Sequence, residues 1–189
     1  MNDRARIIDL LNAAADRHGV DRRYVHAIAR IESGHRQFDA RGNILRSSAG
    51  AMGVMQLMPD TAQMLGVNPQ NLEDNIEGGV RYFRQRLDLA GGDVPTAIAM
   101  YYAGIGNVRE RGALQWQGVQ RYIRNFHALV NNPDIVAMAE RGATPIAVTE
   151  QVQAPVAPVT TITPVRGVEV GLLGAFVVVI LLILILGGR

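Results

Sequence analysis

The stretch DRRYVHAIARIESG, residues Asp21–Gly34, predicts a short helix with an unusual residue on its buried side. Asp21 is a typical N-cap residue, and Val25 and Ile28 mark the apolar face. Glu32 follows Val25 by seven positions and Ile28 by four, so the helical period places it on that same face. The sequence therefore predicts a helix that carries a carboxylic acid to the edge of the core.

The end of this helix gives the acid a second distinguishing property. Ser33 and Gly34 are typical of a helix end, so Glu32 is expected in the last turn. The negative end of the helix dipole and burial both oppose ionisation there, and both raise the pKa of a carboxyl group. A carboxylic acid that stays protonated near neutral pH can act as a general acid. The alternative is that Glu32 turns outward and is solvated.

Composition limits the classes of function. The chain has 189 residues, which is enough for one domain and an appendage, and its 19 basic and 17 acidic residues nearly balance. Because no basic stripe with interleaved aromatic residues occurs, we expect no nucleic-acid partner. Cysteine is absent, which excludes disulfides and thiolate metal sites, and we expect no metal and no cofactor. Residues 1–19 are charged throughout and are not typical of a signal peptide.

Apolar residues recur with helical spacing over most of residues 1–142, and no segment there alternates with period two. The sequence thus predicts an all-α domain over residues 1–142. Helices are expected at residues 3–18, 21–34, 60–65, from Asp74 or Asn75 to 89, 93–103, 108–111 and 119–130, with a final turn at 134–140. Between them, residues 35–48 are predicted to form a polar surface loop in which His35 and Asp39 are solvated.

A small-residue and methionine-rich stretch, AGAMGVMQLMP at residues 49–59, follows this loop. Gly50 and Gly53 would let the backbone approach a ligand closely. Gln56 offers a hydrogen-bond donor and an acceptor in an apolar setting, which suits recognition of amides or hydroxyls. The alternative is a core turn whose methionines fill irregular gaps.

Five patterns occur in a fixed order along the chain: Glu32-Ser33, GVMQLMP at Gly53–Pro59, Asn75-Ile76 with Gly79 and Tyr82, AMYYAG at Ala99–Gly104, and Tyr122. Together they resemble the soluble lytic transglycosylase family, whose catalytic domains have a goose-type lysozyme fold and cleave peptidoglycan glycan strands. The resemblance covers roughly Val20 to Phe126. It has one departure: the family usually has asparagine after the central tyrosine, and this chain has Tyr102.

The resemblance implies a lysozyme-like helical fold and a mechanism with one carboxylic acid. Glu32 would be the catalytic residue, cleaving the bond between N-acetylmuramic acid and N-acetylglucosamine with formation of a 1,6-anhydro ring. The residues implied to bind substrate or to orient Glu32 are Ser33, Met55, Gln56, Tyr101 and Tyr122, without a metal. Two alternatives remain. A hydrolytic muramidase would need a second acid, for which Asp39 is the nearest candidate, and a non-catalytic module would only bind peptidoglycan or form a structural membrane component.

The composition changes after Gly142. Residues 143–168 are rich in proline and contain no aromatic residue, which predicts an extended linker. Residues 169–188 include the apolar run Gly171–Gly188, about 27 Å long as a helix, which predicts a single transmembrane helix and a lipid membrane as partner. With no signal peptide expected, this tail favours a protein of a phage virion membrane, in contact with virion membrane or capsid proteins and acting in the host periplasm. A component of a conjugation or secretion apparatus is the alternative.

Overall fold

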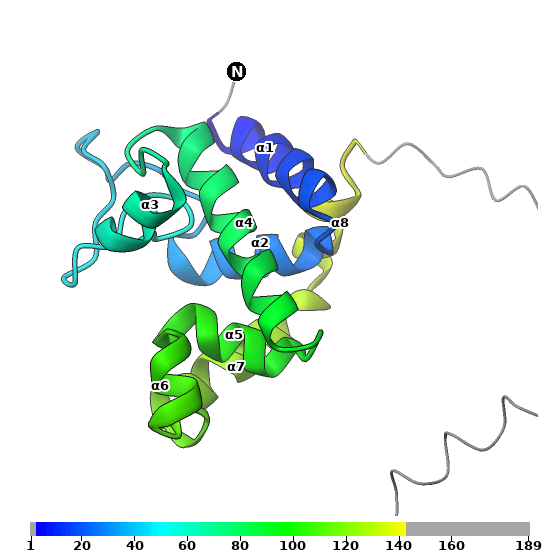
Figure 1. The fold of residues 1–189 in the computed structure, drawn as a ribbon. Helices are drawn as coiled ribbons and strands as arrows, with labels where there is room; N and C mark the ends of the chain where they lie inside the picture. Colours follow the sequence, from blue (N-terminus) through cyan, green and yellow to red (C-terminus); the bar gives the residue numbers. More distant parts are fainter. Residues whose placement is uncertain (1–2, 143–189) are drawn as a thin grey trace, which may run out of the picture. The chain divides into compact units, whose positions relative to one another are not determined.

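The structure, a computed structural model, describes residues 3–142 (Figure 1). Its helices are α1 (Asp3–His18), α2 (Arg22–Glu32), α3 (Pro59–Leu65), α4 (Leu72–Leu89), α5 (Val94–Ala103), α6 (Ile105–Glu110), α7 (Gln117–Val130) and α8 (Pro133–Glu140), with a 3₁₀ turn at Ala113–Gln115. Within residues 3–142 there is no strand, and only isolated β-bridges join parts of residues 38–57. The predicted all-α class is correct for this part of the chain.

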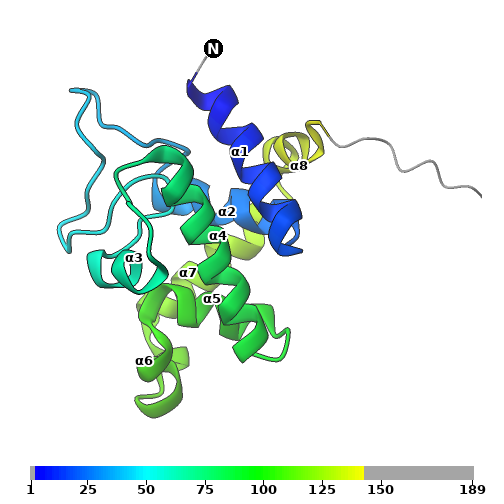
Figure 2. The same cartoon turned by 45° about the horizontal axis from the view of Figure 1, so that its top comes forward.

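Helix α2 lies at the centre of the arrangement and is packed against α1, α7 and α8. Asp21 caps it as predicted, since its side chain accepts a hydrogen bond from the backbone N–H of Arg23. Val25 and Ile28 are fully buried, as the helical period requires. In Figures 1 and 2, α3 and the long loop lie to one side of α2 and α4, while α5, α6 and α7 lie below them.

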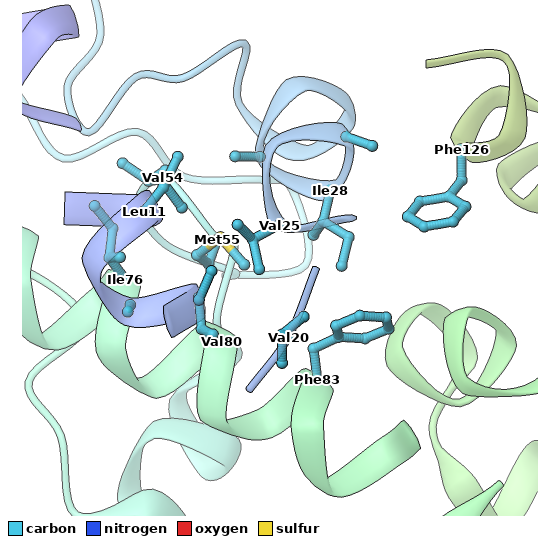
Figure 3. Packing of buried hydrophobic residues seen from close by; sticks show 14 of the residues in the cluster. Leu11, Val20, Val25, Ile28, Val54, Met55, Ile76, Val80, Phe83 and Phe126 are labelled. Atoms are coloured by element: carbon cyan, nitrogen blue, oxygen red, sulfur yellow. The ribbon is translucent and has the colours of Figure 1, made fainter. Parts of the chain in front are cut away.

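The main apolar core joins α1, α2, α4, α5 and α7, and a smaller cluster lies between α5, α6, the 3₁₀ turn and α7. Phe83 of α4 and Phe126 of α7 are the largest fully buried side chains of the main core, and Ile28 of α2 packs beside them (Figure 3). Tyr24 contacts both phenylalanine rings, with centroid distances of 6.5 Å to Phe83 and 5.5 Å to Phe126. Because close-packed interiors resist local movement, this core fixes the direction in which α2 ends.

The structure corrects several predicted helix boundaries. Helix α4 begins at Leu72 and is capped by Asn71, whose side chain accepts a hydrogen bond from the backbone N–H of Asp74 at 2.9 Å. The prediction that Asp74 or Asn75 caps this helix is therefore wrong. Similarly, α3 begins at Pro59, so Asp60 lies in its first turn. Helices α6 and α7 each begin a few residues earlier than expected, and a full helix, α8, replaces the final turn.

His35 was predicted to be solvated, and the structure shows that this is wrong. Its ring is 2% exposed and lies 3.2 Å, Nε2 to Nδ1, from the buried ring of His26. His26 in turn lies 2.9 Å from the side-chain oxygen of Asn12 on α1. Burial lowers the pKa of His26 to about 3 and that of His35 to about 4. Since these values lie below the unfolded value of 6.5, the pair's stabilising effect is present above pH 6.5 and is lost as the pH falls toward 4.

The predicted linker at residues 143–168 and the predicted transmembrane helix at residues 169–188 lie outside the described residues. Within residues 3–142, no helix combines the length and the apolar character that crossing a bilayer requires.

Candidate active site

Glu32 occupies the last position of α2, and a tyrosine from a distant part of the chain holds its carboxylate. The hydroxyl of Tyr122 on α7 donates a hydrogen bond of 2.6 Å to Oε1 of Glu32. Tyr122 is 6% exposed, whereas Glu32 keeps partial access to solvent. The acid is therefore fixed in direction and still reachable by a substrate.

The surroundings of Glu32 raise its pKa from 4.5 to about 7. Burial is the larger cause, and the hydrogen bond from Tyr122 opposes it because it favours the charged carboxylate. Burial and the nearby Glu32 raise the pKa of Tyr122 well above 10, so its hydroxyl stays protonated and remains a donor. A carboxyl group with a pKa near 7 can both donate and accept a proton at neutral pH.

Tyr101 and Ser33 support the acid through the backbone. The hydroxyl of Tyr101 donates to the carbonyl oxygen of Met55 at 2.7 Å, and burial and, second, the negative charge of Glu32 raise the pKa of Tyr101 well above 10. Ser33 is 5% exposed, and its hydroxyl lies 2.8 Å from the carbonyl oxygen of Val54. Because Ser33 is buried, it ties the end of α2 to the neighbouring turn. A contact between Ser33 and the substrate stays a prediction.

Met55 was predicted to line the sugar site, and the structure places its side chain in the core instead. The side chain is fully buried and lies near Val25 and Val80 (Figure 3). Gly79 of α4 makes room for it, since an added Cβ at Gly79 would lie 2.4 Å from Cβ of Met55. Met55 thus contributes to the site only through its backbone carbonyl, which Tyr101 holds.

Two buried amides, which the sequence did not reveal as site residues, hold the turn that carries Val54 and Met55. The side chain of Asn75 accepts from the backbone N–H of Met55 at 2.8 Å and donates to the carbonyl oxygen of Met52 at 2.8 Å. Gln37 accepts from the backbone N–H of Val54 at 3.0 Å. Asn75 belongs to one of the five patterns of the family resemblance, but the sequence indicated no such role for it, and Gln37 carried no signal at all.

Gly53 leaves room for the side-chain amides of Asn75 and Gln37 to reach the backbone of this turn. Its φ is +74°, and an added Cβ would lie 2.5 Å from both the amide nitrogen of Asn75 and the amide oxygen of Gln37. Only glycine fits this position without displacing the hydrogen bonds.

Gln56 lines a pocket together with Tyr101, whose pKa is raised by burial and, second, by the negative charge of Glu32. Gln56 adopts φ 46°, which is uncommon for a residue other than glycine, and its amide nitrogen donates to the carbonyl oxygen of Gly53 at 2.9 Å. The pocket has a volume of about 220 Å³. Its lining residues are Gln56, Leu57, Met58, Thr61, Tyr82, Tyr101, Tyr102, Ala103 and Gly104. Gln56 is thus placed where a sugar amide or hydroxyl could reach it.

Asp39 lies away from this arrangement. Its carboxylate accepts the backbone N–H groups of Arg41 and Asn43 and so orders its own loop. It lines a larger cavity, of about 550 Å³, between the start of α1 and residues 34–39, and none of Glu32, Tyr101 and Tyr122 lines that cavity. Within residues 3–142, no cluster of three or more His, Asp or Glu side chains could hold a metal ion.

A known family model matches the part of the chain that carries this site. Tyr122 follows the matched region by one position. Residues 9–121 match the Transglycosylase SLT domain. The chain belongs to this family. The match contains Glu32, the turn at residues 52–57 and helix α5.

Relatives of this SLT domain come from a phage and from bacteria. The chain is 33% identical over 148 residues to "Transglycosylase" of Enterobacteria phage PRD1, a match that covers 77% of this chain and 52% of the relative. It is 35% identical over 111 residues to "Membrane-bound lytic murein transglycosylase F 1" of Alkalilimnicola ehrlichii, covering 55% of this chain and 21% of the relative. The chain therefore spans about half the length of the first relative and a fifth of the second.

A solved structure shares the fold of the SLT domain. The 70-kDa soluble lytic transglycosylase of Escherichia coli superimposes with a TM-score of 0.54 at 26% sequence identity. The superposition covers 70% of this chain and 24% of the other. The fold is therefore similar to that of one part of a soluble lytic transglycosylase.

We predict that removing either of two supporting groups of the SLT domain lowers activity far less than removing the acid. Tyr122→Phe deletes one hydrogen bond to a charged group, so kcat should fall about 10-fold, and Gln56→Ala should have an effect of similar size. Because the bond from Tyr122 lowers the pKa of Glu32, Tyr122→Phe should also move the alkaline limb of the pH–rate profile to higher pH. A total loss of activity in either folded variant would contradict these roles.

Proposed function

We propose that this chain is a peptidoglycan lytic transglycosylase. The observation that carries the proposal is Glu32, a single carboxyl group with a pKa near 7 that accepts a hydrogen bond from Tyr122. The family and the bacterial relative support the same activity. Because the chain is much shorter than these relatives, the activity of the whole protein is part of the proposal.

In the proposed reaction, Glu32 acts first as an acid and then as a base. Its protonated carboxyl donates a proton to the glycosidic oxygen between N-acetylmuramic acid and N-acetylglucosamine, and the bond to the muramic C1 breaks. The acetamido oxygen of the substrate stabilises the cationic carbon. The ionised Glu32 then takes the proton of the muramic 6-hydroxyl, whose oxygen bonds to C1 and closes the 1,6-anhydro ring. A pKa near neutrality suits both steps.

The surroundings of Glu32 favour this route over hydrolysis with two carboxylates. A two-carboxylate glycosidase holds its acids about 5 to 9.5 Å apart across the sugar. Within residues 3–142, burial raises the pKa of Glu32 and the hydrogen bond from Tyr122 lowers it, and no neighbouring carboxylate contributes to the shift. Asp39, the candidate second acid, is engaged by the backbone of its own loop. A muramidase remains the second candidate because the two reactions share the first proton transfer.

Digestion of purified peptidoglycan sacculi by the full chain, followed by mass spectrometry of the muropeptides, separates the two candidates. Transglycosylation gives terminal muramic residues that are lighter by one water than those from hydrolysis. We expect the lighter, anhydro products. Reducing ends as the main product would establish a muramidase, and undigested sacculi would contradict both activities.

We further propose that the enzyme is a virion protein that opens the wall locally while a phage delivers its genome. The similarity to the transglycosylase of a phage supports this, and the apolar run Gly171–Gly188 supports a single-pass anchor in a virion membrane. Zymography of purified virions before and after detergent tests it. Activity at the size of the full chain that follows the lipid fraction is expected, and particles without activity would contradict the proposal.

A further inference from the structure

Tyr102, at the end of α5, is a large aromatic side chain that the fold leaves open to solvent. It is 48% exposed, although its neighbours Ala99 and Met100 are buried. Exposed aromatic side chains lose contact with water at little conformational cost when a ligand covers them. A position where the fold does not bury such a ring is therefore a candidate contact for a ligand.

The ring of Tyr102 packs against the buried ring of Tyr122. Its centroid lies 4.8 Å from that of Tyr122, with 34° between the ring planes. Its hydroxyl also lies close to Gly118 on α7. A Cβ atom added at Gly118 would lie only 3.2 Å from the hydroxyl oxygen of Tyr102. Tyr122 donates the hydrogen bond to Glu32, so Tyr102 is the exposed ring of a tilted pair whose buried ring contacts the acid.

The same ring lines the pocket of about 220 Å³ together with Tyr101, whose pKa is raised by burial and, second, by the negative charge of Glu32. Gln56 lines this pocket with an amide group and Met58 with an apolar side chain that is 41% exposed. A small number of polar groups among apolar and aromatic surfaces is typical of sites that bind small organic groups. A sugar unit offers both matching surfaces, since C–H groups cover one face of its ring and hydroxyl and amide groups project from its edge.

We infer that Tyr102 is a substrate-contacting residue on which one sugar unit of the glycan strand stacks, next to the bond that is cleaved. This inference rests on the proposed function for the identity of the ligand. The contact with Tyr122 orders the ring before the ligand arrives, so stacking costs little additional entropy. Tyr102 contributes to affinity for glycan and takes no part in proton transfer.

A purely structural role for Tyr102 predicts a different result. If the ring only covered Tyr122, its removal would disturb the bond between Tyr122 and Glu32, lowering kcat and shifting the pH–rate profile. If the ring binds sugar, its removal raises KM and leaves kcat and the profile nearly unchanged. The two roles are therefore separable by steady-state kinetics.

The test compares Tyr102→Ala, Tyr102→Phe and Tyr102→Trp in the full chain, with soluble glycan strands as substrate. Tyr102→Ala should raise KM about 5- to 10-fold with kcat within about 3-fold of wild type, and the two aromatic variants should restore KM. Phe38→Ala is the matched control, because Phe38 is 45% exposed but lines the other cavity, and it should leave KM unchanged. An unchanged KM in Tyr102→Ala, or a loss confined to kcat, would overturn the inference.

A binding measurement separates failure of this inference from failure of the proposed function. Calorimetric titration of glycan strands into Glu32→Gln, with and without Tyr102→Ala, measures affinity without turnover. Binding that Tyr102→Ala weakens about 5- to 10-fold supports the inference even if the wild type forms no anhydro product. Equal binding by both variants, or no binding by Glu32→Gln, contradicts the inference even if the wild type does form that product.

Discussion

Replacing Glu32 by glutamine should lower kcat on glycan strands by at least about 1,000-fold, because general acid catalysis supplies an effect of this size. Glutamine keeps the shape of the side chain and can still accept the hydrogen bond from Tyr122. It has no proton to transfer. Release of soluble muropeptides from sacculi measures the effect, and Glu110→Gln, at an exposed glutamate of α6, is the matched control.

The same variant should be no less stable than the wild type above pH 7. The pKa of Glu32 is about 7 in the folded state and near 4.5 when unfolded, so the stabilising effect of its neutral form is complete below pH 4.5. That effect is lost as the pH rises through 7, and the loss amounts to at most about 3 kcal/mol. Glutamine does not ionise and avoids this loss. A folded Glu32→Gln protein with activity near wild type would show that Glu32 is not the acid.

Replacing Asn75 by alanine should lower the free energy of unfolding by about 3 to 5 kcal/mol and abolish most activity. The side chain of Asn75 is fully buried and satisfies the backbone N–H of Met55 and the carbonyl oxygen of Met52. Alanine leaves the buried N–H of Met55 without a partner and removes one of the two donors to the carbonyl oxygen of Met52, which keeps the N–H of Leu57. The turn that Tyr101 and Ser33 contact would then shift, and the acid would lose its position. Denaturant unfolding measures the stability, and sacculus digestion measures the activity.

Asn71→Ala is the matched control for this prediction, since it makes the same substitution four residues earlier. Asn71 caps α4 at an exposed position, so its loss should cost only about 1 kcal/mol and leave most activity intact. Equal effects of the two substitutions would mean that the hydrogen bonds of Asn75 do not hold the site.

The helix that carries Glu32 was predictable because its information is local. The cap at Asp21 and the spacing of Val25, Ile28 and Glu32 depend on one period within one helix, and the structure contains that helix as predicted. Tyr122 lies 90 residues further on, and its hydrogen bond to Glu32 came only from the resemblance to a family. Periodicity alone places Tyr122 on the inner face of α7 and says nothing about its partner.

The errors lie where contacts are long-range and the backbone is irregular. Asn71 and Asn75 have equal preference for a helix cap, and what distinguishes them is the turn at residues 52–55, which requires the amide of Asn75. Likewise, nothing in a polar loop indicates that His35 packs against His26. For Met55 the sequence left two interpretations open, a sugar site and a core turn, and its full burial agrees with the core turn. Loop residues have no periodicity that would assign a side chain to one face.

The pKa of Glu32 tests the central claim most directly. A titration of the ¹³C-labelled side-chain carboxyl groups of the full chain by NMR would follow it, with the spectrum of Glu32→Gln identifying the resonance. A midpoint near pH 7 is predicted, because burial outweighs the hydrogen bond from Tyr122. A midpoint near 4.5, the ordinary value for a glutamate, would contradict the account, since Glu32 would then be ionised at neutral pH and could not serve as the acid.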